Sequence, residues 1–237
     1  MADIGVKWYA RLEAGDDVHP SAATLAGIAV ALKLSHAEHE YMLDLAGLLA
    51  PLRHGAEVET DVPETVKSLV RSLRGVSISI SDRILTPLLW SYLCDAIYGH
   101  SRYPDPLDRN ALVRGLLDPQ FIEFLGPDYE QIMFRVVGMF RLNYSSATPS
   151  PHAAAVFAKV KDLPLFQRAW QHRVISGELS RREVMVRYHP KVGRLEVYAV
   201  DLSLPNRPDL FVRMLAPAND ETAAKFRQLE RHHEEAT

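Results

Sequence analysis

The sequence is poor in cysteine and contains no long apolar run. Cys94 is the only cysteine among 237 residues, which excludes an internal disulfide and a zinc site built from cysteines. No apolar stretch approaches the roughly 20 residues that a membrane-spanning helix needs. The first five residues also lack the cationic and apolar regions of a signal peptide. Because a single thiol suits a reducing compartment, the sequence predicts a cytoplasmic protein with no membrane partner.

The motifs of common enzyme classes are missing as well. The chain has no Gly-x-Ser-x-Gly elbow, no Gly-x-x-x-x-Gly-Lys phosphate loop and no Gly-x-Gly-x-x-Gly dinucleotide loop. Cys94 has no assignable general base and is expected to be a small buried side chain. His36 lies one helical turn before His39, but this spacing without a cysteine is a weak metal signal. The sequence therefore predicts a protein that is not an enzyme and that binds no cofactor or metal.

The composition that remains is that of an ordinary globular protein. Apolar residues make up 47% of the chain and the formal net charge is -3. The length allows one large domain or two modest ones. No strong global charge points to nucleic acid or to an anionic membrane.

The first 46 residues have the pattern of three short helices. Residues 6–14 place Trp8 one turn before Leu12, and Gly15 follows as the expected C-cap. Ser21 is the expected N-cap of the second helix. Ser35 and Glu38 have the spacing of a capping box that opens the third. The predicted inward faces of the second and third helices comprise Leu25, Ile28, Ala29, Leu32, Met42, Leu45 and Ala46.

A linker and a connecting helix separate these helices from a region that contains strands. Residues 47–62 carry proline, glycine and acidic side chains, which favours a linker. Residues 63–74 form a helix whose predicted apolar stripe comprises Val66, Leu69, Val70 and Leu73. From residue 76 the side chains alternate between apolar and small polar, which is typical of a half-buried strand.

The remaining order of elements is two strands, a mainly helical stretch, three strands and a final helix. The first two strands are predicted at residues 76–80 and 84–89, joined by a turn at Asp82 and Arg83. The longest helix is predicted at residues 127–144. The three later strands place Val184, Val186 and Tyr188 on one face, then Leu195, Val197 and Ala199, then Leu210, Val212 and Met214. This order predicts an α+β fold with a five-stranded antiparallel sheet and helices over one face.

Two groups of residues resemble a known family. The first is Trp8-Tyr9-x-x-Leu12-Glu13-x-Gly15, followed by Pro20-Ser21-Ala22. It is similar to the third and following helices of the XRE-type helix-turn-helix domain of MmyB-like transcription regulators. The resemblance implies that this helix enters the DNA major groove, with Lys7, Trp8 and Arg11 as DNA-binding candidates. Packing of Trp8 within the helices and solvation of the two cations is the alternative for these residues.

The second group is spread over residues 76–216. It comprises Asp118-Pro119, Asp128-Tyr129-Glu130, Phe140-Arg141, Phe166-x-x-x-Trp170-x-x-His172-x-Val174 and His189-Pro190-x-x-Gly193-x-Leu195. These motifs resemble the ligand-binding domain of the same regulators. The family has Trp-Asn where this chain has Trp90-Ser91, and a tryptophan at the position of Tyr129. The resemblance implies a PAS-like fold with an apolar pocket, a fatty-acid-like ligand and a homodimer.

Candidate ligand-binding residues follow from the aromatic and cationic side chains of this region. Ligand pockets are mostly apolar with a few polar anchors. The apolar candidates are Trp90, Tyr92, Phe134, Met139 and Phe140, with ordinary core packing as the alternative. The candidate anchors for a carboxylate are Arg135, Arg141 and His172, with surface salt bridges as the alternative.

The predicted domains are a partial helix-turn-helix domain (residues 1–50), a linker with a connecting helix (51–75) and a PAS-like ligand-binding domain (76–237). The similarity begins at the third helix of the helix-turn-helix domain, and a recognition helix needs a partner helix to fix its angle on DNA. Residues 1–50 contain three basic and seven acidic side chains, a balance that opposes phosphate binding. Two hypotheses follow, which are a ligand-responsive DNA-binding regulator and a sensor or dimerisation module that does not bind DNA by itself.

Overall fold

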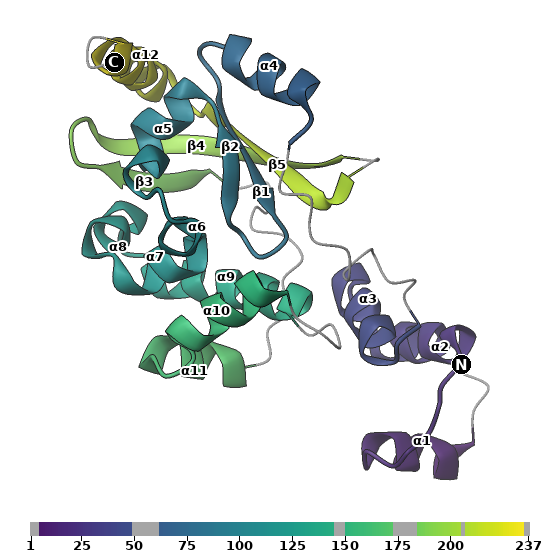
Figure 1. Ribbon diagram of the computed structural model, residues 1–237. Coiled ribbons are helices and arrows are strands. Elements are labelled where there is room, and N and C mark those ends of the chain that lie inside the picture. The colour runs from purple at the N-terminus through teal and green to yellow at the C-terminus, as the bar shows by residue number, and fades with distance from the viewer. Residues whose placement is uncertain (1–4, 49–61, 145–149, 173–183, 205–206, 235–237) are drawn as a thin grey trace.

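The computed structural model describes residues 5–48, 62–144, 150–172, 184–204 and 207–234. Three short helices come first, α1 (Val6–Glu13), α2 (Ala22–Leu32) and α3 (His36–Leu45), and helix α4 (Glu64–Ser72) follows. The rest of the chain forms an antiparallel sheet and its covering helices (Figure 1). Most of the predicted linker lies outside the described residues.

The predicted helix caps in the N-terminal segment are confirmed. The Ser21 hydroxyl accepts a hydrogen bond from the backbone N–H of Thr24 (3.1 Å). Ser35 and Glu38 form a reciprocal capping box, in which the Glu38 carboxylate accepts from the Ser35 N–H at 2.7 Å. Gly15 has a φ of 78°, the left-handed conformation expected just after a helix.

The predicted apolar faces of these helices are partly wrong. Leu25, Ile28 and Ala29 are buried as expected. Leu32 is 54% exposed and Leu45 is 62% exposed, because each lies in the last turn of its helix, beyond the contact between α2 and α3. Leu69 in α4 is 58% exposed, since only the Val66 and Val70 side of this helix packs against the sheet.

Five antiparallel strands form one sheet in the order β2-β1-β5-β4-β3. Their bounds are β1 (Ser77–Asp82), β2 (Pro87–Trp90), β3 (Met185–His189), β4 (Gly193–Leu204) and β5 (Arg207–Pro217). The two strands before the helical stretch and the three after it meet where β1 pairs with β5. The predicted α+β fold and five-stranded antiparallel sheet are confirmed.

The turn between β1 and β2 is longer than the predicted one. The Asp82 carboxylate accepts a hydrogen bond from the Thr86 N–H at 2.7 Å, and Leu85 adopts a φ of 71°. Ile84 and Leu85 therefore belong to the turn rather than to the second strand, although both are buried. An apolar run alone could not distinguish a buried turn from a strand.

The sheet buries both faces of its central strands. Ile78 lies opposite Met214 and Ile80 opposite Val212, and this face packs against α4 through Val70. The other face carries Leu195, Val197 and Leu215 and forms the larger core with the helices. These helices are α5 (Tyr92–Tyr98), the 3-10 helix η1 (His100–Arg102), α6 (Pro106–Arg109), α7 (Ala111–Leu117), α8 (Pro119–Leu125), α9 (Tyr129–Tyr144), α10 (Pro151–Val160), α11 (Pro164–Gln171) and α12 (Asp220–Glu234).

Ser91 joins the sheet to the helical layer. Its hydroxyl accepts a hydrogen bond from the Cys94 N–H (3.3 Å), as the N-cap of α5. The same oxygen accepts from the Ile78 N–H (3.0 Å) of β1 and donates to the Val76 carbonyl (2.9 Å). One side chain therefore links the first residues of β1 to the first turn of α5.

Asp82 makes stability depend on pH. Burial raises the pKa of Asp82 from 3.8 to about 6, against the lowering effect of hydrogen bonds from Thr86 and Ile84. The stability that the protonated Asp82 carboxyl contributes is present below pH 4 and is lost as pH rises through 6, because the folded state then has to hold a buried charge.

Asp82→Asn keeps an oxygen acceptor but cannot ionise. We expect its stability relative to the parent to rise between pH 4 and 6, by on the order of 1–3 kcal/mol. Thermal melts from pH 4 to 7.5 measure this difference. Asp162→Asn, at an exposed carboxylate, is the control, and a difference that stays constant with pH would refute the expectation.

Gly126 ends α8 in a conformation that other residues avoid. Its φ of 75° and ψ of −158° lie in a region occupied almost only by glycine, and a Cβ there would lie 2.3 Å from Tyr188. We expect Gly126→Ala to lower the free energy of unfolding by roughly 2–4 kcal/mol. Gly193→Ala is the matched control, because its φ is 73° but nothing lies within 4 Å of the new Cβ. It should lose only about 1 kcal/mol. Urea unfolding of both variants tests this, and equal losses would show that the Tyr188 contact does not matter.

Candidate functional site

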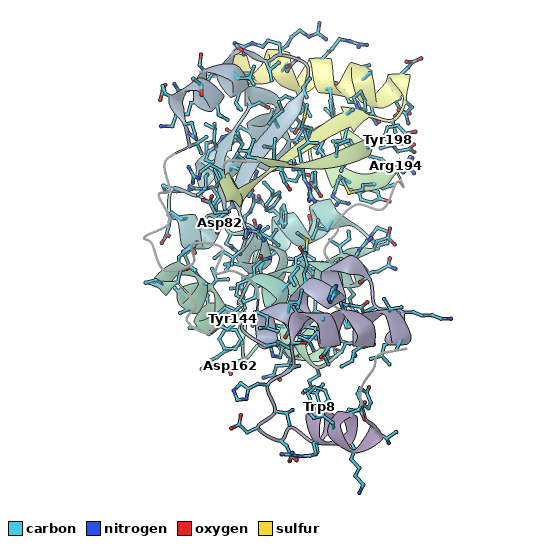
Figure 2. All side chains as sticks on the ribbon, turned by 90° about the vertical axis from the view of Figure 1, so that its right-hand side faces the viewer. Trp8, Asp82, Tyr144, Asp162, Arg194 and Tyr198 are labelled. Atoms are coloured by element: carbon cyan, nitrogen blue, oxygen red, sulfur yellow. The ribbon has the colours of Figure 1, made fainter. Side chains whose placement is uncertain are left out.

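Aromatic side chains gather where α9, α10 and α11 meet. The ring of Tyr144 lies 4.7 Å from that of Phe157 and 5.2 Å from that of Phe140. Phe166 stacks on Trp170 at 5.2 Å. Phe140 is fully buried, whereas Tyr144, Phe157 and Trp170 are half-buried. Figure 2 shows Tyr144 within the helical layer, away from Tyr198 on the sheet. Of these residues only Phe140 was a predicted ligand contact, although the spacing of Phe166 and Trp170 on one helix face was visible in the sequence.

Arg141 belongs to this aromatic group. It is buried, its guanidinium lies 4.6 Å from the centre of the Trp170 ring, and it donates a hydrogen bond to the Ala169 carbonyl at 3.4 Å. A cation over an indole ring is stabilised by the charge distribution of the ring. Arg141 therefore fastens α9 to α11.

The other predicted residues of α9 lie elsewhere on the helix. The ring of Phe134 meets that of His172 edge-on at 5.5 Å, and His172 is exposed at the end of α11. Arg135 and Met139 lie one turn apart and are half-buried. These positions leave apolar and cationic atoms of α9 only partly covered.

Trp90 is the last residue of β2 and Tyr92 is the first residue of α5. The Trp90 ring lies 5.3 Å from that of His100 and 5.1 Å from the Arg109 guanidinium. The eight predicted ligand-binding residues thus occupy different parts of the helical layer. Whether any of them binds a ligand stays a prediction.

The sheet supplies cations that the sequence pattern did not suggest. In β3 the buried residues are Arg187 and His189, while Tyr188 is 38% exposed and Val184, just before the strand, is 41% exposed. His189 is held by the Ala96 carbonyl at 3.1 Å, and burial lowers its pKa. Arg187 faces the helical layer from a position opposite Leu195. The prediction that Val184, Val186 and Tyr188 form the buried face of this strand is therefore wrong, because Arg187 and His189 on the other face are the buried residues.

A cavity of about 240 Å³ lies between α5, η1, α7, α8, α12 and the turn after β3. None of the eight predicted residues lines it. Its polar groups are largely engaged with one another, because Arg114 donates to the Tyr98 carbonyl at 2.9 Å and Ser101 donates to the Asp95 carboxylate at 2.6 Å. Arg114 also forms a salt bridge with Asp118 at 3.3 Å. Arg114 also lies 4.3 Å from the rings of Tyr103 and Phe121. These contacts are those of a structural junction.

Two buried groups are unsuited to acid–base or nucleophilic chemistry near neutral pH. Burial raises the pKa of the Cys94 thiol to about 12, so it is not a thiolate. Burial and the charges of Arg114 and Arg109 lower the pKa of His100 to about 3, so its ring is neutral. Within the described ranges no three histidine, cysteine or acidic side chains gather as a metal site would require.

The predicted DNA-binding residues lie on α1, which buries none of its side chains. Lys7 and Arg11 are exposed and Trp8 is half-buried. Arg11 forms a salt bridge with Asp16 at 3.0 Å. Figure 2 shows Trp8 on this helix, at the far end of the view from the sheet. Among the residues described, no helix is long and apolar enough to span a membrane.

Comparison with protein families identifies the chain. The model of the MmyB-like transcription regulator ligand binding domain matches residues 62–229, which is most of the chain and includes α4, all five strands, helices α5 to α11 and the first part of α12. A comparison with curated proteins found no significant match. The chain therefore belongs to the MmyB-like family, as its motifs indicated.

Proposed function

We propose that this member of the MmyB-like family is a transcription regulator controlled by a small apolar ligand. Its C-terminal domain, residues 76–237, binds the ligand, which is fatty-acid-like by resemblance. Its N-terminal helices contact DNA through Lys7, Trp8 and Arg11. The protein acts as a cytoplasmic homodimer.

The observation that carries this proposal is the family match across the entire sheet and most of the helical layer. The helical layer supports it, because apolar side chains such as Phe134, Met139 and Trp170 are only partly covered there. Apolar walls with few polar groups are the usual lining of a site for small apolar molecules.

Helix α4 offers a route from ligand to DNA. It contacts β2, and its Val70 shares an apolar cluster with Ile78 and Ile80 of β1, on the face of the sheet opposite the helical layer. A ligand that shifts these strands also shifts α4, which precedes them in the chain. The ligand acts only if its affinity differs between the two arrangements of α4.

A sensor or dimerisation module without DNA binding is the second candidate. It is favoured by the acidic balance of residues 1–50 and by the pairing of Arg11 with Asp16. An arginine already bound to a carboxylate has to break that pair before it can contact a phosphate or a base.

Native mass spectrometry of the protein purified without added lipid tests ligand binding. We expect a bound apolar molecule, or binding of a medium-chain fatty acid on titration. Met139→Gln places an amide among apolar side chains and should weaken binding about tenfold, since roughly 1–2 kcal/mol of apolar burial is removed. Tyr198→Gln, at an exposed position of β4, is the matched control and should bind normally. A parent protein that binds no apolar molecule would contradict the sensor role.

A mobility-shift titration on the DNA beside the protein's own gene separates the two candidates. The regulator predicts a shift that weakens for Lys7→Ala and Arg11→Ala, with a salt dependence reduced by about one unit for each phosphate that is no longer neutralised. Arg231→Ala, exposed on α12, should bind as the parent does. Absence of any shift with the parent protein would favour the module that does not bind DNA.

A further inference from the structure

Strand β4 extends beyond the strand that lies next to it. β3 pairs only with residues 193–197 of β4, and this ladder ends where Met185 faces Val197. Residues 198–204 of β4 pair with β5 on one side. On their other side no strand of the described residues pairs with them. In the described part of the chain this half of β4 is therefore an edge of the sheet.

The backbone along this edge has groups that point away from the sheet. The Glu196 carbonyl accepts a hydrogen bond from the Ala218 N–H at 2.8 Å, on the β5 side of the strand. Backbone N–H and C=O groups point alternately to the two sides of a strand. Those of Ala199 and Asp201 therefore point to the open side. A row of such groups is a template on which another strand can pair.

The same half of β4 exposes an apolar face. Tyr198, Val200 and Leu202 alternate on one face of the strand and are 48%, 52% and 47% exposed. Helix α4 covers this face of the sheet only near β2, since one helix about 10 Å wide spans about two strands. The β5 residues that share the uncovered face are also apolar, namely Val212, Met214 and Ala216. A patch of exposed apolar side chains without charges is typical of the centre of a protein interface.

We propose that this edge of β4 pairs antiparallel with the same edge of a second copy of the chain, about a two-fold axis at Val200. This assignment rests on the proposed homodimer and deepens it. Ala199 then lies opposite Asp201 of the second copy, and the two exchange backbone hydrogen bonds. Tyr198 lies opposite Leu202 of the second copy. Each exposed apolar side chain thereby gains an apolar neighbour across the strands.

Charge and occupancy select this register over its neighbours. An axis at Asp201 would place two Asp201 carboxylates opposite each other, and like charges in that position are destabilising. An axis at Ala199 would require the edge of Val197, which already pairs with β3. An axis at Leu202 would leave Tyr198 without an apolar neighbour. The edge is therefore most complementary to itself when the axis passes through Val200.

The contact is small for a permanent dimer. Residues 198–202 span about 17 Å at 3.4 Å per residue. A strand pair of this length buries less than the roughly 800 Å² per partner that is usual for a stable interface. We therefore expect a dimer that dissociates on dilution.

Cysteine cross-linking of the full chain tests the register. Val200 faces its own counterpart as a non-hydrogen-bonded pair, in which the Cα atoms lie about 4.5 Å apart, within the range of a disulfide. We expect Val200→Cys to form a covalent dimer in air with a copper catalyst. Leu202→Cys is the matched control, because its two copies would lie about 14 Å apart. Cys94 is buried, so the parent should stay uncross-linked. Cross-linking of Leu202→Cys to the same extent, or none with Val200→Cys, would overturn the pairing.

Sedimentation velocity over a range of concentrations measures the dimer itself. Val200→Lys places two ammonium groups on the two-fold axis and should weaken the dimer at least tenfold. Val30→Lys, at a valine of α2 that is 77% exposed, should dimerise as the parent does. Both variants should bind dodecanoate as the parent does, because Val200 lies on the face of the sheet away from the helical layer. A parent dimer that Val200→Lys leaves intact would overturn only the β4 interface. A parent that stays monomeric would contradict the proposed homodimer as well.

Amide hydrogen exchange distinguishes a second copy from other occupants of the edge. The N–H groups of Ala199 and Asp201 should exchange more slowly as the protein concentration rises. The N–H of Val200 points toward β5 and should be protected at every concentration, which makes it an internal control. Protection of Ala199 and Asp201 that does not depend on concentration would show that another segment of the same chain covers the edge. Fast exchange of both at every concentration would show that no second copy pairs there.

Discussion

The pairing of β1 with β5 is the contact on which the rest of the domain depends. It joins a hairpin from before the helical stretch to a three-stranded unit from after it, and without it the helices would cover two separate pieces of sheet. The pairing also sorts side chains by face. Ile78 and Ile80 turn toward α4, and Ser77 and Ser79, which alternate with them, turn toward the helical layer. These small side chains let α5 approach closely, so that Cys94 lies against Ser77 and Ser79.

Local signals in the sequence were sufficient for the order of elements. Alternation from residue 76, the serine caps and the length of α9 each depend on near neighbours in the chain, and each was confirmed. Errors arose where burial depends on distant elements. Ile84 and Leu85 are as apolar as strand residues, yet the Asp82 carboxylate and a left-handed Leu85 place them in a turn. Leu32 and Leu45 continue their apolar faces beyond the helices that could cover them.

The candidate site was less accessible to sequence reasoning. In β3 the apolar residues suggested the inward side, but Arg187 and His189 are the buried ones. An arginine in a strand is normally assigned to solvent, and nothing near Arg187 in the chain reveals that it is buried. The family motifs identified the domain correctly. They could not say which cations lie beneath the helices, because that depends on how α9 is placed over the sheet.

The hydrogen bonds of the Ser91 hydroxyl show which side chains can replace this serine at low cost. One oxygen there caps α5, accepts from β1 and donates to the Val76 carbonyl. An asparagine at this position would carry its acceptor and its donor on separate atoms. The position therefore calls for a short side chain that can give and receive hydrogen bonds at once. A substitution that keeps both abilities can change the chemical group while the bonding pattern between sheet and helix stays the same.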